Sequence, residues 1–228
     1  LLVLAPLPGF VAALGAVGGA PLVLGGEGLR LTFELDLPGA LLFGVSSLLW
    51  SGAGVYAASY YRGKPDTGRF VVCWLMALIG CLGAFVAADL IGFYLLLAVM
   101  TLGAAGMVIQ DETPRAWRAG ITYLMLALAG EAAVLMGMIL LAVHTPGDSL
   151  LIRDVMAALP SSPVRALALW FLVGGFCLKV GMFPLHVWMP LAYSAAPIPA
   201  SAVLSGAVVK VGLIGLIRFL PGDVALPG

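Results

Sequence analysis

Charged residues are scarce in this chain. Asp, Glu, Lys and Arg make up 10% of its 228 residues, whereas a soluble domain carries about 25%. The 11 basic residues balance the 11 acidic ones, so the chain has no excess positive charge with which to bind nucleic acid. Hydrophobic residues make up 62%, and the mean hydropathy is +1.13. This composition predicts an integral membrane protein that contacts the lipid bilayer.

Residues and motifs that bind cofactors are also scarce. The three cysteines lie inside apolar runs without the spacing of metal ligands, and we interpret them as small buried residues. No GxGxxG motif follows a predicted strand, and the chain has no P-loop, CxxC or CxxCH motif. We therefore predict no cofactor, no bound metal and no catalytic residue, although this leaves open whether the chain serves an enzyme complex.

Long apolar runs dominate the sequence instead. About 20 apolar residues cross the ~30 Å hydrocarbon layer as a helix, and open sheet edges are not tolerated there. We therefore predict an all-α polytopic bundle of about seven membrane-spanning segments, the first of them weakened by prolines and glycines. The segments are Leu1–Leu24, Gly39–Tyr61, Phe70–Ala88, Leu90–Ile109, Ala119–Val143, Arg165–Phe183 continuing past a break, and Ala200–Leu220.

The loops carry most of the charge. Five cations follow the second and fourth runs, against three in the opposite loops, which favours the cytoplasmic side for the first set (Arg62, Lys64, Arg69, Arg115 and Arg118 against Arg30, Arg153 and Arg165). Asp89 is nearly all that separates the third run from the fourth, so we expect a tight helical hairpin with Asp89 as a helix N-cap. Residues 144–164 predict an outside loop with a short surface helix.

Prolines interrupt the sixth run. The segment Pro184–Pro199 reads PLHVWMPLAYSAAPIP and holds four prolines. Because an internal proline removes a backbone hydrogen bond and clashes with the preceding turn, the helix should break near Pro184. Broken helices at membrane depth line cavities in transporters. We assign Trp188 and Tyr193 to the membrane interface, where amphipathic rings concentrate.

Three charged residues lie deep inside the apolar runs. They are Lys179, close to the predicted break, Lys210, in the middle of the last run, and Glu131, in the middle of the fifth. An ionised side chain at the bilayer centre costs at least ~2.5–3.5 kcal/mol and needs a partner, water or a function. Arg218, near the end of the last run, is interpreted as an interfacial anchor.

These residues suggest a proton path. Burial favours the neutral form of a lysine, so Lys179 could gain and lose a proton, solvated by carbonyls freed at the break; the alternative is a lysine that reaches the headgroups. Lys210 is too deep for that and would communicate with Lys179 through water. Glu131 paired with Lys179 would alter its proton affinity, or would form a purely structural ion pair. His186 would relay protons, or would cap or pack.

One stretch resembles a known family. LKVGMFPLHVWMPLAYSAAPIPASAVLSGAVVKVGLIGLIRF is similar to the antiporter-like membrane subunits of respiratory complex I, of multi-subunit cation/proton antiporters and of proton-pumping hydrogenases. The pattern is a lysine, P-L-H-x-W-x-P, A-P-x-P-x-S-A and a second lysine on the next helix. The segments YYRGKPDTGRF and ADLIGFYLLLAVMTL look like the same family's earlier helices.

The resemblance implies an architecture. Such proteins usually have about fourteen helices in two inverted five-helix units, each with a broken helix. The chain then looks like a fragment covering the N-terminal half. Residues 1–89 would be N-terminal transmembrane helices, and residues 90–228 a proton-channel half-unit whose five helices begin near Phe70 and whose broken helix spans residues 165–199. Lys179 matches the lysine of the broken helix, and Lys210 that of the following helix.

The resemblance also implies a function. It is proton translocation by one subunit of a redox-driven complex of the NADH:quinone or hydrogenase type, beside other membrane subunits, in the bacterial inner membrane. The alternatives are a subunit of a multi-subunit Na⁺/H⁺ antiporter, a proton-driven subunit of an inorganic-carbon uptake system, and a structural membrane anchor.

The sequence departs from the family at one position. Most members carry a glutamate in the motif FYLxxE, where this chain has Ala98. That acid normally pairs with the first lysine and couples neighbouring subunits. We expect Glu131, one helix later and at similar depth, to replace it.

Overall fold

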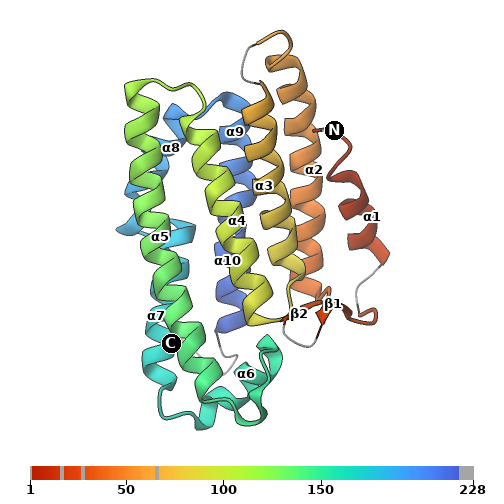
Figure 1. Cartoon of the computed structure of the whole chain (residues 1–228), viewed down its shortest axis with the longest axis vertical. Helices are drawn as coiled ribbons and strands as arrows, with labels where there is room; N and C mark the ends of the chain where they lie inside the picture. Colours follow the sequence, from red (N-terminus) through yellow and green to blue (C-terminus); the bar gives the residue numbers. More distant parts are fainter. Residues whose placement is uncertain (1, 16–17, 27–28, 65–66, 221–228) are drawn as a thin grey trace, which may run out of the picture.

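The computed structural model describes residues 2–15, 18–26, 29–64 and 67–220. Helices dominate it, which confirms the all-α membrane bundle (Figure 1). Six helices are long and apolar enough to cross a membrane within these residues. Four of them are continuous: α2 (Leu37–Tyr60), α3 (Thr67–Val86), α4 (Leu90–Ile109) and α5 (Pro114–Val143).

The last two spans are irregular. The fifth consists of α7 (Arg165–Val180), the 3₁₀ turn η3 (Leu185–Val187) and α8 (Trp188–Ala195). The sixth consists of α9 (Ile198–Val203), a π-helical segment η4 (Leu204–Val208) and α10 (Val209–Phe219). The break predicted near Pro184 is therefore confirmed.

The first predicted span is wrong. Helix α1 (Leu7–Gly15) has only nine residues, and at 1.5 Å per residue it is about 14 Å long, too short to cross the hydrocarbon layer. Strands β1 (Leu22–Gly26) and β2 (Leu29–Phe33) follow as an antiparallel hairpin, so they have the wrong geometry for a helical span. Prolines and glycines in this region disfavour a long helix.

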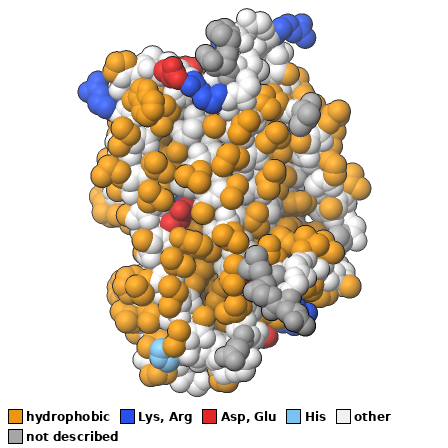
Figure 2. Space-filling model, in the orientation of Figure 1, with side chains coloured by type: hydrophobic (Ala, Val, Ile, Leu, Met, Phe, Trp, Pro, Cys, Tyr) orange, Lys and Arg blue, Asp and Glu red, His pale blue; other side chains and the backbone are white. Residues whose placement is uncertain are grey.

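The outside of the bundle is apolar. Figure 2 shows hydrophobic side chains covering most of the visible face, with lysines and arginines mainly near its upper end. Large side chains on the outer helix faces are exposed, among them Val45, Ile79, Met125 and Trp170. Such a continuous apolar surface suits contact with lipid or with other membrane helices.

Helix α4 forms the centre of the bundle. Of its membrane window 56% is buried, against 28% for the broken span, which therefore lies at the periphery of this chain. Rings from α4, α7 and α10 meet at the centre of the bundle: the centroid of Phe93 on α4 lies 6.0 Å from that of Phe176 on α7 and 5.8 Å from that of Phe219 on α10. The centre of the bundle is thus closely packed and apolar, which makes any buried charge inside it costly.

Asp89 organises the turn between α3 and α4. One of its carboxylate oxygens, Oδ1, accepts the Gly92 N–H at 2.7 Å, which confirms the predicted N-cap. The other oxygen accepts the Thr32 N–H at 2.6 Å and so ties strand β2 to the bundle. Helix α6 (Ile152–Ala158), the predicted short helix between the fifth and sixth runs, lies at the same end (Figure 1).

Candidate functional site

The end of α7 is fixed by its own backbone. Gly181 adopts the left-handed conformation with φ 73°, which glycine reaches without steric cost. Its N–H bonds the Leu178 carbonyl at 3.3 Å, and the Met182 N–H bonds the Cys177 carbonyl at 2.9 Å. This pair of bonds is a Schellman motif, a common way to end a helix. Lys179 therefore lies in a well-defined last turn of α7, directly before the break.

A glycine contact brings α5 and α7 together. A Cβ atom added to Gly175 would lie 2.5 Å from the Gly130 carbonyl oxygen. A larger residue at position 175 would therefore push α5 and α7 apart. Gly130 directly precedes Glu131, and Gly175 lies one turn before Lys179, on the same side of α7. The close approach therefore places the two ionisable side chains within reach of each other.

Lys179 and Glu131 form a buried ion pair. The Lys179 ammonium nitrogen lies 2.5 Å from Glu131 Oε1, and the two side chains are 6% and 4% exposed. Removing one partner of such a pair costs about 3–5 kcal/mol, because it leaves an isolated charge in an apolar interior. The pairing expected from the sequence is present.

Thr101 of α4 is the third member of this cluster. Its hydroxyl oxygen accepts a hydrogen bond from Lys179 and contacts Glu131 Oε1. Since the hydroxyl has one hydrogen, it donates either to Glu131 or to the Leu97 carbonyl, 3.0 Å away. Sequence reasoning missed Thr101, although its depth in α4 matches that of Glu131 in α5. Ala98, where the family's usual acid would stand, lies one turn before Thr101 on α4.

Two expectations about the break are wrong. The carbonyls freed there do not solvate Lys179, because the Leu178 carbonyl accepts the Trp188 indole N–H at 3.0 Å and the lysine bonds side chains instead. Trp188 is not an interfacial residue: it is 4% exposed, and its ring lies 5.2 Å from that of Tyr123. Tyr193 is half-buried with an enclosed hydroxyl. Both rings face the bundle because α8 packs against α5.

Lys210 lies outside the cluster. Its ammonium donates to the Ser205 carbonyl at 2.7 Å, within the π-helical segment η4. Gly212, two residues later, packs on α7, since a Cβ atom there would lie 3.1 Å from Lys179 Cβ. Residues two apart on a helix point in roughly opposite directions. The structure therefore places the two lysines on adjacent helices without bringing their ammonium groups into the same cluster.

His186 also lies apart from the ion pair. It is an exposed residue of η3, with its ring centroid 5.7 Å from that of Phe183. Of the four residues singled out from the sequence, the structure thus brings together Lys179 and Glu131 and leaves Lys210 and His186 outside their cluster.

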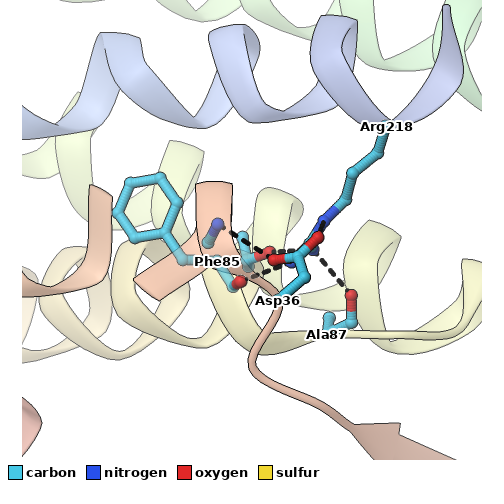
Figure 3. A network of polar contacts seen from close by, with 6 residues as sticks. Asp36, Phe85, Ala87 and Arg218 are labelled. Carbon is cyan, nitrogen blue, oxygen red and sulfur yellow. Dashed lines mark hydrogen bonds and ion pairs between the residues drawn. The ribbon is translucent and has the colours of Figure 1, made fainter. Parts of the chain in front are cut away.

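A second ion pair closes one end of the bundle. Arg218 of α10 donates to both carboxylate oxygens of Asp36, at 2.8 and 3.2 Å (Figure 3). It also donates to the carbonyls of Ala84, Phe85 and Ala87 at the end of α3. The Arg218 side chain is only 8% exposed. The expectation of an interfacial anchor is therefore wrong: Arg218 caps α3 and joins it to α10 and to the start of α2.

Within the described residues, no three or more His, Cys, Asp and Glu side chains gather in a way that could hold a metal ion. The clustered groups of the site are thus an amine, a carboxylate and a hydroxyl, all three able to exchange protons.

Comparison with known families identifies the family of the region that holds this cluster. Residues 87–225 match the family model described as NADH:quinone oxidoreductase/Mrp antiporter, TM. The chain belongs to this family. The matched region contains the whole Lys179–Glu131–Thr101 cluster and the broken helix, and it confirms the resemblance drawn from the sequence.

Individual relatives agree. The chain is 33% identical to NADH-quinone oxidoreductase subunit N of Desulforudis audaxviator (strain MP104C), over 85% of this chain and 38% of that protein. It is 31% identical to hydrogenase-4 component B of Escherichia coli (strain K12), over 82% of this chain and 28% of that one. The chain thus spans less than half the length of these relatives.

A solved structure shares the fold. A chain of the membrane-bound sulfane sulfur reductase, an archaeal respiratory membrane complex, superposes with a TM-score of 0.79 at 21% identity, over 94% of this chain and 46% of that one. At this identity the likeness concerns the fold alone.

Proposed function

We propose that this chain translocates protons through the Lys179–Glu131 pair, as an antiporter-like subunit of a redox-driven membrane complex. The observation that carries the proposal is a lysine–carboxylate pair enclosed among apolar helices, directly before a break in one of them. A proton reaching the pair can convert it from two charges to one, and proton release reverses the change. The neutral lysine is accessible because burial opposes its charge.

The pair is suited to switching rather than to static support. Ion pairs in a low-dielectric interior are weak contributors to stability, since the cost of desolvation offsets much of their attraction. A change in the field, produced by a charge arriving elsewhere in a complex, would therefore shift the balance between the paired and the neutral state. In this proposal Glu131 takes the place of the acid that the family resemblance leads us to expect at Ala98.

In this proposal Lys210 and His186 are further residues of the proton path, outside the Lys179–Glu131 pair. Lys210 is held at a backbone carbonyl of the π-helical segment, and π-helical turns often mark functional sites. His186 follows the break and has both a donor and an acceptor when neutral. Residues 90–228 would form the transporting half-unit and residues 1–89 the helices that flank it. Water would link Lys210 and His186 with the Lys179–Glu131 pair.

The wider assignment follows the relatives. The named relatives belong to NADH-quinone oxidoreductase and hydrogenase-4, so we place this chain among other membrane subunits of such a complex, in the bacterial inner membrane. The family description also names the Mrp antiporter, so a Na⁺/H⁺ antiporter subunit is the alternative. Proton movement that requires sodium would favour the alternative, and proton movement driven by electron transfer would favour the main proposal.

The test is proton uptake into inverted membrane vesicles that carry the chain in its native complex. A pH-sensitive dye reports uptake, vesicles that lack the chain provide the background, and assembly and electron transfer are measured in parallel. Lys179→Ala should reduce uptake to background with the complex still assembled. Uptake that is unchanged in Lys179→Ala would show that the chain is a scaffold.

A further inference from the structure

Lys179 has a third N–H group beside a small cavity. Two of its hydrogens point to Glu131 and Thr101, and an ammonium has three. The cavity of about 10 Å³ is lined by Lys179, Tyr123, Trp188 and apolar side chains. By the same measure one water occupies about 10–15 Å³ and requires polar neighbours. The lysine and the tyrosine provide them, so the cavity has the size and polarity for a single water.

Tyr123 joins this cavity to the ion pair. Its side chain is 3% exposed, and it lines the cavity together with Lys179. Tyr123 lies eight residues before Glu131 on α5, so it is about 12 Å nearer to the end at which α5 begins. In Figure 1 this is the upper end of the bundle, where α8 also lies. Tyr123 therefore lies between the ion pair and the end of the bundle at which α5 begins.

Tyr193 of α8 lies near Tyr123, with Trp188 as their shared contact. Its ring and that of Tyr123 both pack on Trp188, with centroids 6.0 and 5.2 Å away. Within the described chain, the buried Tyr193 hydroxyl has no hydrogen-bond partner. Because an enclosed hydroxyl without a partner is costly, native proteins retain few of them without a water or a function.

We propose that Tyr123 carries protons between Lys179 and the end of the bundle at which α5 begins, with one water in the cavity before it and Tyr193 after it. The proposal rests on the proposed function of the Lys179–Glu131 pair and adds its exit. It assigns two residues for which the sequence pattern of the family's lysines and prolines provides no role.

Each step conserves protons. An N–H bond of Lys179 breaks as the cavity water gains that proton and passes one of its own to the Tyr123 oxygen. Tyr123 releases its original O–H proton toward Tyr193, which releases one in turn. One proton leaves Lys179, one leaves Tyr193, and no electron moves. The hydroxyls then rotate back for the next proton.

The experiment is proton uptake by vesicles that carry Tyr123→Phe in the native complex. Phenylalanine keeps the ring that packs on Trp188 and removes only the hydroxyl. Uptake per assembled complex should fall at least about tenfold, since a positioned proton carrier typically contributes 10²–10⁴-fold. Tyr61→Phe is the matched control, because Tyr61 is also a buried tyrosine but lies outside this cluster; it should transport normally.

A second variant separates transport from the geometry of the pair. Tyr193 does not contact Lys179 or Glu131, so Tyr193→Phe should lower uptake with the pair intact, and substituting D₂O for water should slow the unmodified protein more than either variant. Normal uptake in Tyr123→Phe, or in Tyr193→Phe, beside a defective Lys179→Ala would overturn the route and leave the proposed function standing. Normal uptake in Lys179→Ala would instead overturn the proposed function.

Discussion

The ion pairs of Lys179 and Arg218 use different cations in different ways. Lys179 in the middle of the bundle has one carboxylate and one hydroxyl as partners. Arg218 at the end of the bundle donates to one carboxylate and three backbone carbonyls. Lysine can release its proton, whereas the arginine guanidinium stays charged in proteins.

The Lys179–Glu131 pair can change its charge and is called the switch, whereas the Arg218–Asp36 pair holds helix ends together and is called the clamp. Arg218 satisfies carbonyls that the end of α3 leaves without helical partners, and its planar group holds Asp36 with two bonds. Neither role requires Arg218 to release a proton. The Lys179–Glu131 pair binds no backbone group in the bonds described, so the pair can lose its charges without unfolding a helix end. The two sites differ in the number and kind of partners and also in burial, since the Glu131 side chain is 4% exposed and that of Asp36 is 43% exposed.

Apart from changes at Lys179 itself, the largest effect should come from removing the carboxylate of Glu131. Glu131→Gln leaves the Lys179 ammonium without a carboxylate, so the neutral lysine is favoured and proton uptake should fall at least about tenfold. Adding Ala98→Glu to this variant offers a carboxylate from α4, one turn before Thr101, and should restore part of the uptake. Ala98→Glu alone serves as the control for the added bulk.

Failure of the rescue has a clear meaning. If the double variant assembles but transports no better than Glu131→Gln, Glu131 does not substitute for the acid at position 98. If Glu131→Gln transports normally, the ion pair is a structural contact and the comparison with Arg218 no longer holds.

A smaller effect, on stability alone, should come from the clamp. Arg218→Lys keeps the charge near Asp36 but loses the fork of donors, so carbonyls of Ala84, Phe85 and Ala87 lose their partner. The loss should be about 1–3 kcal/mol, the cost of leaving buried acceptors unsatisfied. A lower midpoint of thermal unfolding with unchanged uptake per assembled complex supports the clamp. Impaired uptake at an unchanged midpoint contradicts it.

Much of the bundle was predictable from the sequence, for physical reasons. Apolar runs long enough to cross a membrane have few structural options other than helices, and prolines mark the break before Pro184. The first run failed because mean hydropathy does not distinguish a long helix from a short helix followed by a hairpin. The glycines and prolines in that run indicated that a long helix was unfavourable there. Their effect on the local backbone conformation was stronger than the tendency of an apolar run to form one long helix.

The site was predictable in part. A lysine and a glutamate at similar depth suggested the pair, because isolated charges are costly in an apolar interior. Thr101 and Tyr123 were missed, since threonine and tyrosine are common in membrane helices and only packing shows which ones meet a charge. Arg218 was misassigned for a related reason: a position near a helix end looks interfacial until the partners from α2 and α3 are known.

The most direct measurement is proton uptake by vesicles that carry Lys179→Arg, with Arg218→Lys vesicles prepared in parallel. Arginine keeps the positive charge beside Glu131 but cannot release a proton. If proton exchange at residue 179 is the transport step, Lys179→Arg takes up protons only at the background rate in an assembled complex, while Arg218→Lys transports normally. Uptake by Lys179→Arg at the rate of the unmodified protein would contradict the account, because a fixed charge would then be sufficient.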